Sequence, residues 1–333
     1  MTLARDGKSQ DSTRAPDSRG AGAAVVGALG EGLLELSLDP TLAEATLGRG
    51  FGGDAANVAV MAAKSGARAR LLTRVGDDSA GRMLLEFWGS AGVDLSAVEV
   101  DPDAATGLYV NERDQLGAHR FSYHRTGSAA SLLAPRHAAQ SFLGGLDVLH
   151  VTGITLSISA SAAQAAELAA ERAREAGAAV SFSVNYREPL TPDHERLTAF
   201  ARAADLVFLS VEDARALFSA ERVEDVAATL ARPATEIVMT HGARPATLLS
   251  GRELHTLAPP RVEAIDAAGA GDALAGAYLA ARFSGAEPRL ALAHGVVAGA
   301  LSCRGTGCAR SYPSASEVAT ALRSLGAAET VLT

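Results

Sequence analysis

The stretch AANVAVMAAKSGARARLLTRVGDDSAGRMLLEFWGSAG, residues 55–92, decides the fold class of this chain. It starts with apolar residues at helical spacing up to a glycine stop, continues as a short strand over 68–78, and ends in a second helix over 79–92. Residues 23–36 before it predict one buried strand with glycines at its end. Strands and helices that alternate in this way predict an α/β fold with a parallel sheet covered by helices.

The alternation continues farther along the chain. Further strands are expected over 147–153, 178–188, 205–210 and 235–242, helices over 159–177, 192–204, 211–218 and 223–232, and only helices after Asp272. Residues 101–134 differ, because Val, Tyr and Phe occur there in short alternating runs around the turn-like RDQLG. This pattern predicts a β-hairpin, and residues 37–51 are expected to supply further strands. A hairpin inserted into an α/β sheet is a candidate lid over a ligand site.

The composition excludes several classes of protein. Of the 333 residues, 48% are hydrophobic and 20% charged, which indicates a globular chain with a sizeable core. The net charge of −8 argues against a nucleic-acid surface, and no membrane span is expected. Residues 1–22 are polar without an apolar signal segment and predict a disordered tail before one domain over 23–330. Cys303 and Cys308 could form a disulfide or bind a metal, but two reduced thiols in a cytoplasmic protein are the expectation.

A glycine-rich motif with one acid lies in EAIDAAGAGDALAGAYLAA, residues 263–281. VEAID predicts a strand, AAGAG a loop, and the residues from Asp272 onward a helix. A glycine-rich loop at a helix N-terminus presents unpaired N–H groups and the positive end of the helix dipole, which together favour an anion. The residues alone leave two interpretations of Asp272, a helix N-cap or a base beside a bound phosphate.

A second motif precedes the first predicted helix, where two glycines stand before polar side chains. Backbone N–H groups, a carboxylate and an amide all bond hydroxyls, so the motif predicts either a capped helix or the floor of a site for a hydroxyl-rich ligand, formed by Gly52, Gly53, Asp54 and Asn57. No G-x-x-x-x-G-K motif occurs, which excludes a P-loop ATPase. The G-x-G-x-x-G fingerprint is also absent, so a Rossmann oxidoreductase has little support.

Together the two motifs resemble the signatures of the ribokinase/PfkB family of sugar kinases. The first resembles G-G-x-x-x-N-x-A…G…G-x-D-x-x-G, at Gly52, Gly53, Asn57, Ala59, Gly66, Gly76, Asp78 and Gly81. The second resembles D-T-x-G-A-G-D, at Asp266, Gly269, Ala270, Gly271 and Asp272, with Ala267 in place of the usual Thr. The resemblance covers residues 23–325. It implies a ribokinase-like three-layer α/β/α sandwich, with a mainly parallel sheet and a small β-lid.

The resemblance also implies the chemistry at the second motif. Asp272 is expected to be the catalytic base, with its pKa kept low by the helix N-terminus, and the N–H groups of Gly269, Ala270 and Gly271 to bind the transferring phosphoryl group. ATP and Mg²⁺ are the implied partners, and K⁺ is a candidate near Asp266. A homo-oligomer that pairs through the lid is expected by the same resemblance.

Four shorter segments resemble the branch of the family that phosphorylates 2-keto-3-deoxygluconate, namely TGLYVNE, YHRTGSAAS, LHVTGIT and VNYRE. The resemblance implies that Tyr109, Tyr123, Arg125 and Arg187 surround a sugar acid whose 6-hydroxyl is phosphorylated. The chemistry agrees, because a carboxylate favours bidentate arginine and a neutral sugar does not need it. Taken singly, Arg125 and Arg187 have the alternative interpretation of solvated surface arginines. A fructokinase-like kinase of neutral sugars and a non-catalytic sugar-acid binding protein remain the alternative functions.

The nucleotide end departs from the family pattern. The family's T-x-G-x-x-G is met by Thr240 and Gly242, but Pro245 replaces the last glycine. The N-x-x-E near the metal appears as SVED, with Ser210 toward the nucleotide and Asp213 as the candidate metal ligand. His294 stands where some relatives carry Asn near the adenine.

Overall fold

The computed structural model describes residues 22–38, 47–113, 119–188, 190, 193–230 and 236–331. Residues 1–21 lie outside this part of the chain, so the disordered tail remains a prediction. Among the described residues, no helix is long and apolar enough to cross a membrane.

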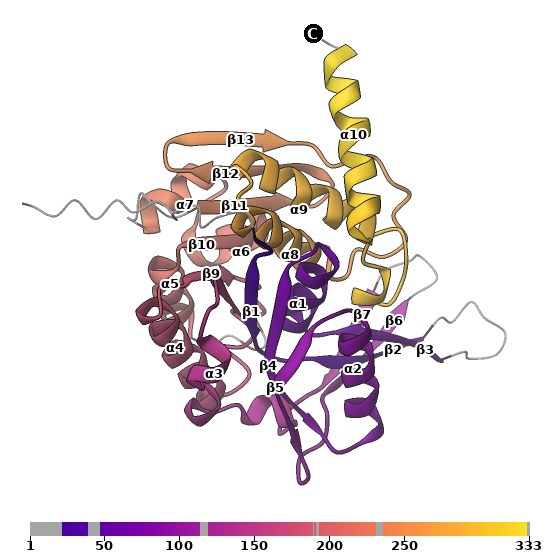
Figure 1. Ribbon diagram of the computed structural model, residues 1–333, viewed down its shortest axis with the longest axis vertical. Coiled ribbons are helices and arrows are strands. Elements are labelled where there is room, and N and C mark those ends of the chain that lie inside the picture. The colour runs from indigo at the N-terminus through magenta and orange to yellow at the C-terminus, as the bar shows by residue number, and fades with distance from the viewer. Residues whose placement is uncertain are drawn as a thin grey trace, which may run out of the picture.

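A nine-stranded sheet forms the centre of the molecule (Figure 1). Its strand order is β13 (Glu253–Leu257), β12 (Arg244–Ser250), β11 (Glu236–His241), β10 (Leu206–Ser210), β9 (Ala179–Ser183), β8 (Val148–Thr152), β1 (Val25–Leu29), β4 (Arg68–Gly76) and β5 (Asp94–Asp101). The seven strands from β11 to β5 are parallel, as the alternation predicts. The antiparallel hairpin β12–β13 extends one edge and was not predicted.

Helices cover both faces of this sheet, which gives the expected three-layer α/β/α sandwich (Figure 1). The molecule has two apolar cores, which involve different sets of helices. The first contains residues of α1 (Asp54–Lys64), α2 (Ser79–Ser90), α8 (Ala270–Phe283), α9 (Pro288–Ser302) and α10 (Ala315–Val331). The second contains residues of α3 (Gln140–Leu143), α4 (Ala160–Glu175), α5 (His194–Ala203), α6 (Val211–Phe218) and α7 (Val223–Leu230). Short 3₁₀ turns occupy Ala129–Leu132, Pro135–His137 and Ala309–Ser311.

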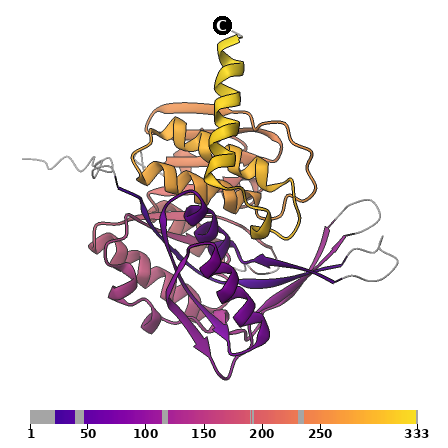
Figure 2. The ribbon, with the colours of Figure 1, turned by 45° about the vertical axis from the view of Figure 1, so that its right-hand side comes forward.

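A second, small sheet has the strand order β3 (Leu47–Gly52), β2 (Leu33–Leu38), β6 (Leu108–Arg113) and β7 (His119–His124). It extends sideways from the body of the molecule (Figure 2). The hairpin expected within 101–134 and the strands expected near 37–51 thus belong to one sheet. The segments 39–46 and 114–118 lie outside the described residues.

Two expectations about strands were wrong. Residues 23–36 form two strands rather than one, because the chain leaves β1 and enters β2 of the small sheet. The passage between them is tight, since a Cβ on Gly30 would lie 2.3 Å from Thr155 Oγ1 and one on Gly32 would lie 2.2 Å from the Trp88 ring. VEAID, at 262–266, is not a strand; its backbone meets the end of α9 instead, where Ile265 N–H donates to the carbonyl of Cys303.

Candidate active site

A cavity of about 460 Å³ opens at the carboxyl ends of the parallel strands. This edge is where open α/β sheets bind their ligands. One side of the cavity belongs to the small sheet, through Leu33, Tyr109, Phe121 and Tyr123. Residues at or just after the ends of β1, β8, β9, β10 and β11 form the floor, namely Glu31, Ile154, Asn185, Ser210 and Thr240.

The start of α8 forms the wall that carries Asp272. Gly269 caps the helix with φ 76°, and Tyr312 Oη donates to its carbonyl at 2.7 Å. Asp272 lies in the first turn, and its Oδ2 accepts a hydrogen bond from Asn57 Nδ2 at 2.8 Å. The N-cap interpretation of Asp272 was therefore wrong. Gly271 lines the cavity, and a Cβ there would meet nothing within 4 Å, so the space beside this turn is open. The N–H of Ala270, predicted to bind the phosphoryl group, donates instead to the carbonyl of Ala267 at 3.2 Å.

The expected low pKa of Asp272 was also wrong. Loss of water around the carboxyl and the neighbouring charge of Asp54 raise its pKa to about 7, against the opposing effects of Asn57, Asn185 and Arg187. The helix N-terminus does not offset this desolvation. A carboxyl with a pKa near neutrality is suited to accept a proton.

The start of α1 brings a second acid beside the first. Gly53 caps this helix with φ 91°, and a Cβ there would lie 2.5 Å from the carbonyl oxygen of Glu31. Asp54 is buried, and its Oδ2 accepts from Asn185 Nδ2 at 3.1 Å. Gly52 does not line the cavity, since it packs on the ring of Tyr109, where a Cβ would come within 2.6 Å.

Arginines and aromatic rings also line the cavity. The guanidinium carbon of Arg125 lies over the ring of Tyr123, 4.3 Å from the ring centroid. Arg125 is buried, and its Nη1 pairs with Glu31. Arg187 is exposed and donates to the carbonyl of Tyr186 at 2.8 Å. Tyr109 is buried, and its hydroxyl is committed to Glu35 of the small sheet at 2.8 Å.

The residues predicted for the nucleotide lie partly in this cavity. Ser210 and Asp213 form a capping box at the start of α6, and Asp213 Oδ1 also accepts from Tyr186 N at 2.9 Å. Both carboxylate oxygens of Asp213 are thus occupied within the protein. Thr240 and Gly242 line the cavity where β11 turns into β12.

Besides Gly52, two predicted residues lie outside the cavity lining. His294 is half-buried on α9, and burial lowers its pKa. Asp266 is buried, and its Oδ1 accepts from Ala268 N at 2.8 Å. Their predicted roles toward the adenine and a monovalent cation stay predictions.

Both cysteines are free, as expected. Cys308 is buried beside the start of α8, and its Sγ accepts from Asn57 Nδ2 at 3.2 Å. Burial raises its pKa well above that of an ordinary thiol, so it is a packing residue rather than a reactive one.

Sequence reasoning missed four polar residues of the cavity, namely Glu31, Ser183, Asn185 and Glu212. Glu31 and Asn185 follow the ends of β1 and β9, so their position after a parallel strand was an available signal. Glu212 begins α6, and only its nearness to Ser210 pointed to it.

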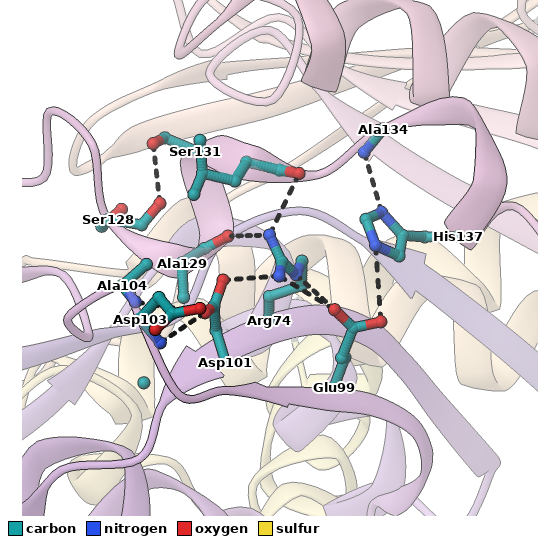
Figure 3. Close-up of polar contacts among 12 residues, drawn as sticks. Arg74, Glu99, Asp101, Asp103, Ala104, Ser128, Ala129, Ser131, Ala134 and His137 are labelled. Atoms are coloured by element: carbon teal, nitrogen blue, oxygen red, sulfur yellow. Dashed lines mark hydrogen bonds and ion pairs between the residues drawn. The ribbon is translucent and has the colours of Figure 1, made fainter.

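A buried arginine joins the two chain segments that lead into and out of the small sheet (Figure 3). On the outgoing side, Arg74 donates to Glu99 Oε1 at 2.9 Å and pairs with Asp101 Oδ2 at 2.5 Å. On the returning side, it donates to the carbonyls of Ala129 at 3.5 Å and Leu132 at 3.2 Å. One side chain therefore fixes both roots of the β6–β7 hairpin, the part of the small sheet that carries Tyr109 and Tyr123.

We expect Arg74→Met to lower the melting temperature by several degrees, because two carboxylates and two carbonyls lose their donor. In the sugar kinase that the resemblance implies, KM for the sugar should rise more than KM for ATP. Thermal unfolding and steady-state kinetics measure both effects. Arg82→Met is the control, because the contacts of Arg82 are exposed: an ion pair with Asp77 at 3.5 Å and a hydrogen bond to Ser79 Oγ at 3.1 Å. Equal melting temperatures and KM values in the two variants would contradict the anchoring role.

Comparisons with known proteins agree with this geometry. The family model for pfkB carbohydrate kinases matches residues 23–315. The chain is similar to a 2-dehydro-3-deoxygluconokinase of Thermoproteus tenax, at 33% identity over 312 residues that cover 90% of this chain and 94% of that protein. It is also similar to Fructokinase-1 of Zea mays, at 32% identity over 272 residues that cover 78% and 83%.

Among solved structures, a fructokinase from Vibrio cholerae in its fructose, ADP and calcium ion bound form superposes with a TM-score of 0.81. Its sequence is 25% identical, and the match covers 90% of this chain and 98% of that one. The family match spans both signature motifs and the cavity that they form. The chain therefore belongs to the PfkB family of carbohydrate kinases.

Proposed function

We propose that this sugar kinase transfers the γ-phosphoryl group of ATP to the 6-hydroxyl of 2-keto-3-deoxygluconate. The observation that carries the proposal is the shape of one continuous cavity. Its lining brings together Asp272 and the first turn of α8, two arginines, and residues at the end of β11. The similarity to the Thermoproteus tenax enzyme supports the sugar acid as substrate.

In this proposal, Asp272 accepts the proton of the attacking hydroxyl. Asn57 holds the carboxyl by donating to Oδ2, which leaves Oδ1 for the substrate. Asn185 and Asp54 form the adjacent polar floor, suited to the other hydroxyls. The base thus stands between the sugar and the loop that binds the phosphoryl group.

The first turn of α8 stabilises the charge on the transferring phosphoryl group through its N–H groups and dipole. Mg²⁺ bound with the nucleotide would neutralise phosphate charge. The described residues contain no cluster of three or more His, Cys, Asp or Glu side chains placed to hold a metal. An ion that is held mainly by phosphate oxygens and water does not need such a cluster.

The small sheet is proposed to act as a lid. Tyr109 and Tyr123 already line the cavity from that sheet, and Arg74 fixes the roots of their hairpin. Closing it over the sugar would exclude water, which competes as a phosphoryl acceptor.

The direct test is a substrate panel with coupled detection of ADP, comparing 2-keto-3-deoxygluconate with fructose and ribose. We expect the highest kcat/KM for the sugar acid. Preference for fructose would favour the neutral-sugar alternative, which the similarity to the Zea mays enzyme keeps in view. Tight binding of the acid without ADP formation would favour a sugar-acid binding protein.

Arg187→Met is expected to raise KM for the sugar acid by about ten- to hundredfold, the value of a hydrogen bond to a charged group. Arg187 lines the cavity, and within the described part of the chain its guanidinium donates to the carbonyl of the neighbouring Tyr186. Steady-state kinetics with the acid and with fructose measure the change. An equal rise of KM for both sugars would exclude carboxylate recognition by Arg187.

The pH dependence of kcat/KM should report the protonation of Asp272. Because the pKa of Asp272 is raised to about 7, kcat/KM is expected to fall as the pH decreases below about 7, where the carboxyl becomes protonated. Asp54→Asn removes a negative charge that raises this pKa, so the acid limb of the profile should move to lower pH. A limb that stays in place in this variant would contradict the assignment.

A further inference from the structure

Three buried polar atoms without a hydrogen-bond partner in the described chain belong to residues of the cavity: Glu31 Oε2, Asn57 Oδ1 and Arg125 Nε. Two are acceptors and one is a donor. Unpartnered buried polar atoms cost free energy, so such atoms at a cavity wall indicate a ligand that supplies their partners. A hydroxyl-rich molecule supplies both kinds.

The position of Glu31 is fixed by its surroundings. It lies between Gly30 and Gly32, where added Cβ atoms would overlap Thr155 and Trp88, so the backbone cannot shift outward. Glu31 as a whole residue is 1% exposed, and Arg125 is 7% exposed. The pair thus lies deep in the cavity rather than at its mouth.

The pair also sets the charge of this end of the cavity. Glu31 pairs with the Nη1 edge of Arg125, and the ring of Tyr123 covers one face of the guanidinium at 4.3 Å. The Nε edge stays without a partner. Burial raises the pKa of Glu31 to about 7, with Arg125 opposing and Asp54 adding to the rise. Above that pH the ionised Glu31 counters much of the positive charge of Arg125, while the Nε of Arg125 stays without a partner.

We propose that Glu31 is a specificity-determining residue: it orients Arg125, limits the attraction of the cavity for anionic sugars, and accepts a ligand hydroxyl at Oε2. This inference rests on the proposed function only in assuming a hydroxyl-rich ligand. It makes one carboxylate responsible for the relative affinity of the cavity for sugar acids and neutral sugars. By their names, chains similar to this one phosphorylate one or the other of these two classes.

Gluconate and glucitol form a matched pair of probes, since they differ only in a carboxylate against a hydroxymethyl group. Their Kd values would be measured by calorimetry on the full-length protein. Glu31→Gln keeps an acceptor for Arg125 and removes the charge, so the preference for gluconate over glucitol should rise by about tenfold or more. Arg125→Met should shift this preference in the opposite direction. Glu31→Ala also removes the support of Arg125 and should weaken both ligands.

Glu212→Gln is the matched control, because it removes one negative charge from the same cavity at the end near Ser210. It should leave the ratio of the two Kd values unchanged. An unchanged ratio in Glu31→Gln, or a loss of both ligands in that variant, would overturn the proposal and leave Glu31 a structural residue. Equal shifts in Glu31→Gln and Glu212→Gln would overturn it as well, since the effect would then be general to the cavity.

These outcomes are separable from the proposed function. Phosphorylation of fructose rather than the sugar acid by the wild type would reject the substrate assignment. The Kd ratio of the probe pair would still test Glu31, because it needs no turnover.

Discussion

Replacement of Asp272 by asparagine is expected to lower kcat by about 10²–10⁴-fold, the usual effect of losing a general base. Asparagine keeps the size of the side chain and an oxygen that can accept from Asn57, so the wall of the cavity should persist. KM for ATP should stay close to the wild-type value. Steady-state kinetics over a range of both substrates separate these quantities.

Asp54→Asn is the matched comparison, because Asp54 is a second acid in the same cavity. It binds Asn185 rather than Asn57 and is assigned to the sugar, so its loss should raise KM for the sugar more than it lowers kcat. Near wild-type kcat in Asp272→Asn would remove Asp272 from the role of base. Equal kcat losses in both variants would show that charge in the cavity, and not one proton acceptor, limits the rate.

The second large effect is expected from a pair of glycines two positions apart. Gly269→Ala should destabilise the fold by about 2–5 kcal/mol, the sum of strain at a positive φ and of overpacking. Gly269 has φ 76°, and a Cβ there would lie 2.5 Å from Cys308 Sγ and 2.7 Å from Tyr312 Oη. Chemical denaturation measures the change in the free energy of unfolding.

Gly271→Ala should leave stability unchanged or raise it slightly, because its Cβ meets nothing within 4 Å and it lies within α8. It should nevertheless reduce kcat/KM for ATP by about 10²-fold, since the methyl group enters the space assigned to the phosphoryl group. A stable variant with full activity would show that this space is not the phosphoryl site. Equal destabilisation by the two substitutions would contradict the described start of α8.

The order of strands and helices could be predicted because each depends on local patterns. Apolar periodicity and glycine stops located α1, β4 and α2, and the carboxyl ends of β10 and β11 were placed by the same means. The hairpin β12–β13 was not predicted because it is an antiparallel addition at the sheet edge. It follows β11, where the predicted alternation of strands and helices ends. VEAID failed as a strand because it pairs with the end of α9 and not with a sheet.

The sequence by itself located the two motifs that line the cavity, since Gly53, Asn57 and Asp272 were named from their residue types and spacing. Only the tertiary structure decided the state of those groups. Asp272 meets Asn57 across 215 positions of sequence, and Arg125 meets Glu31 across 94. Hydration and charge pairing follow from such distant contacts, which no local pattern encodes. For this reason the raised pKa of Asp272 and the countered charge of Arg125 could be found only in the folded chain.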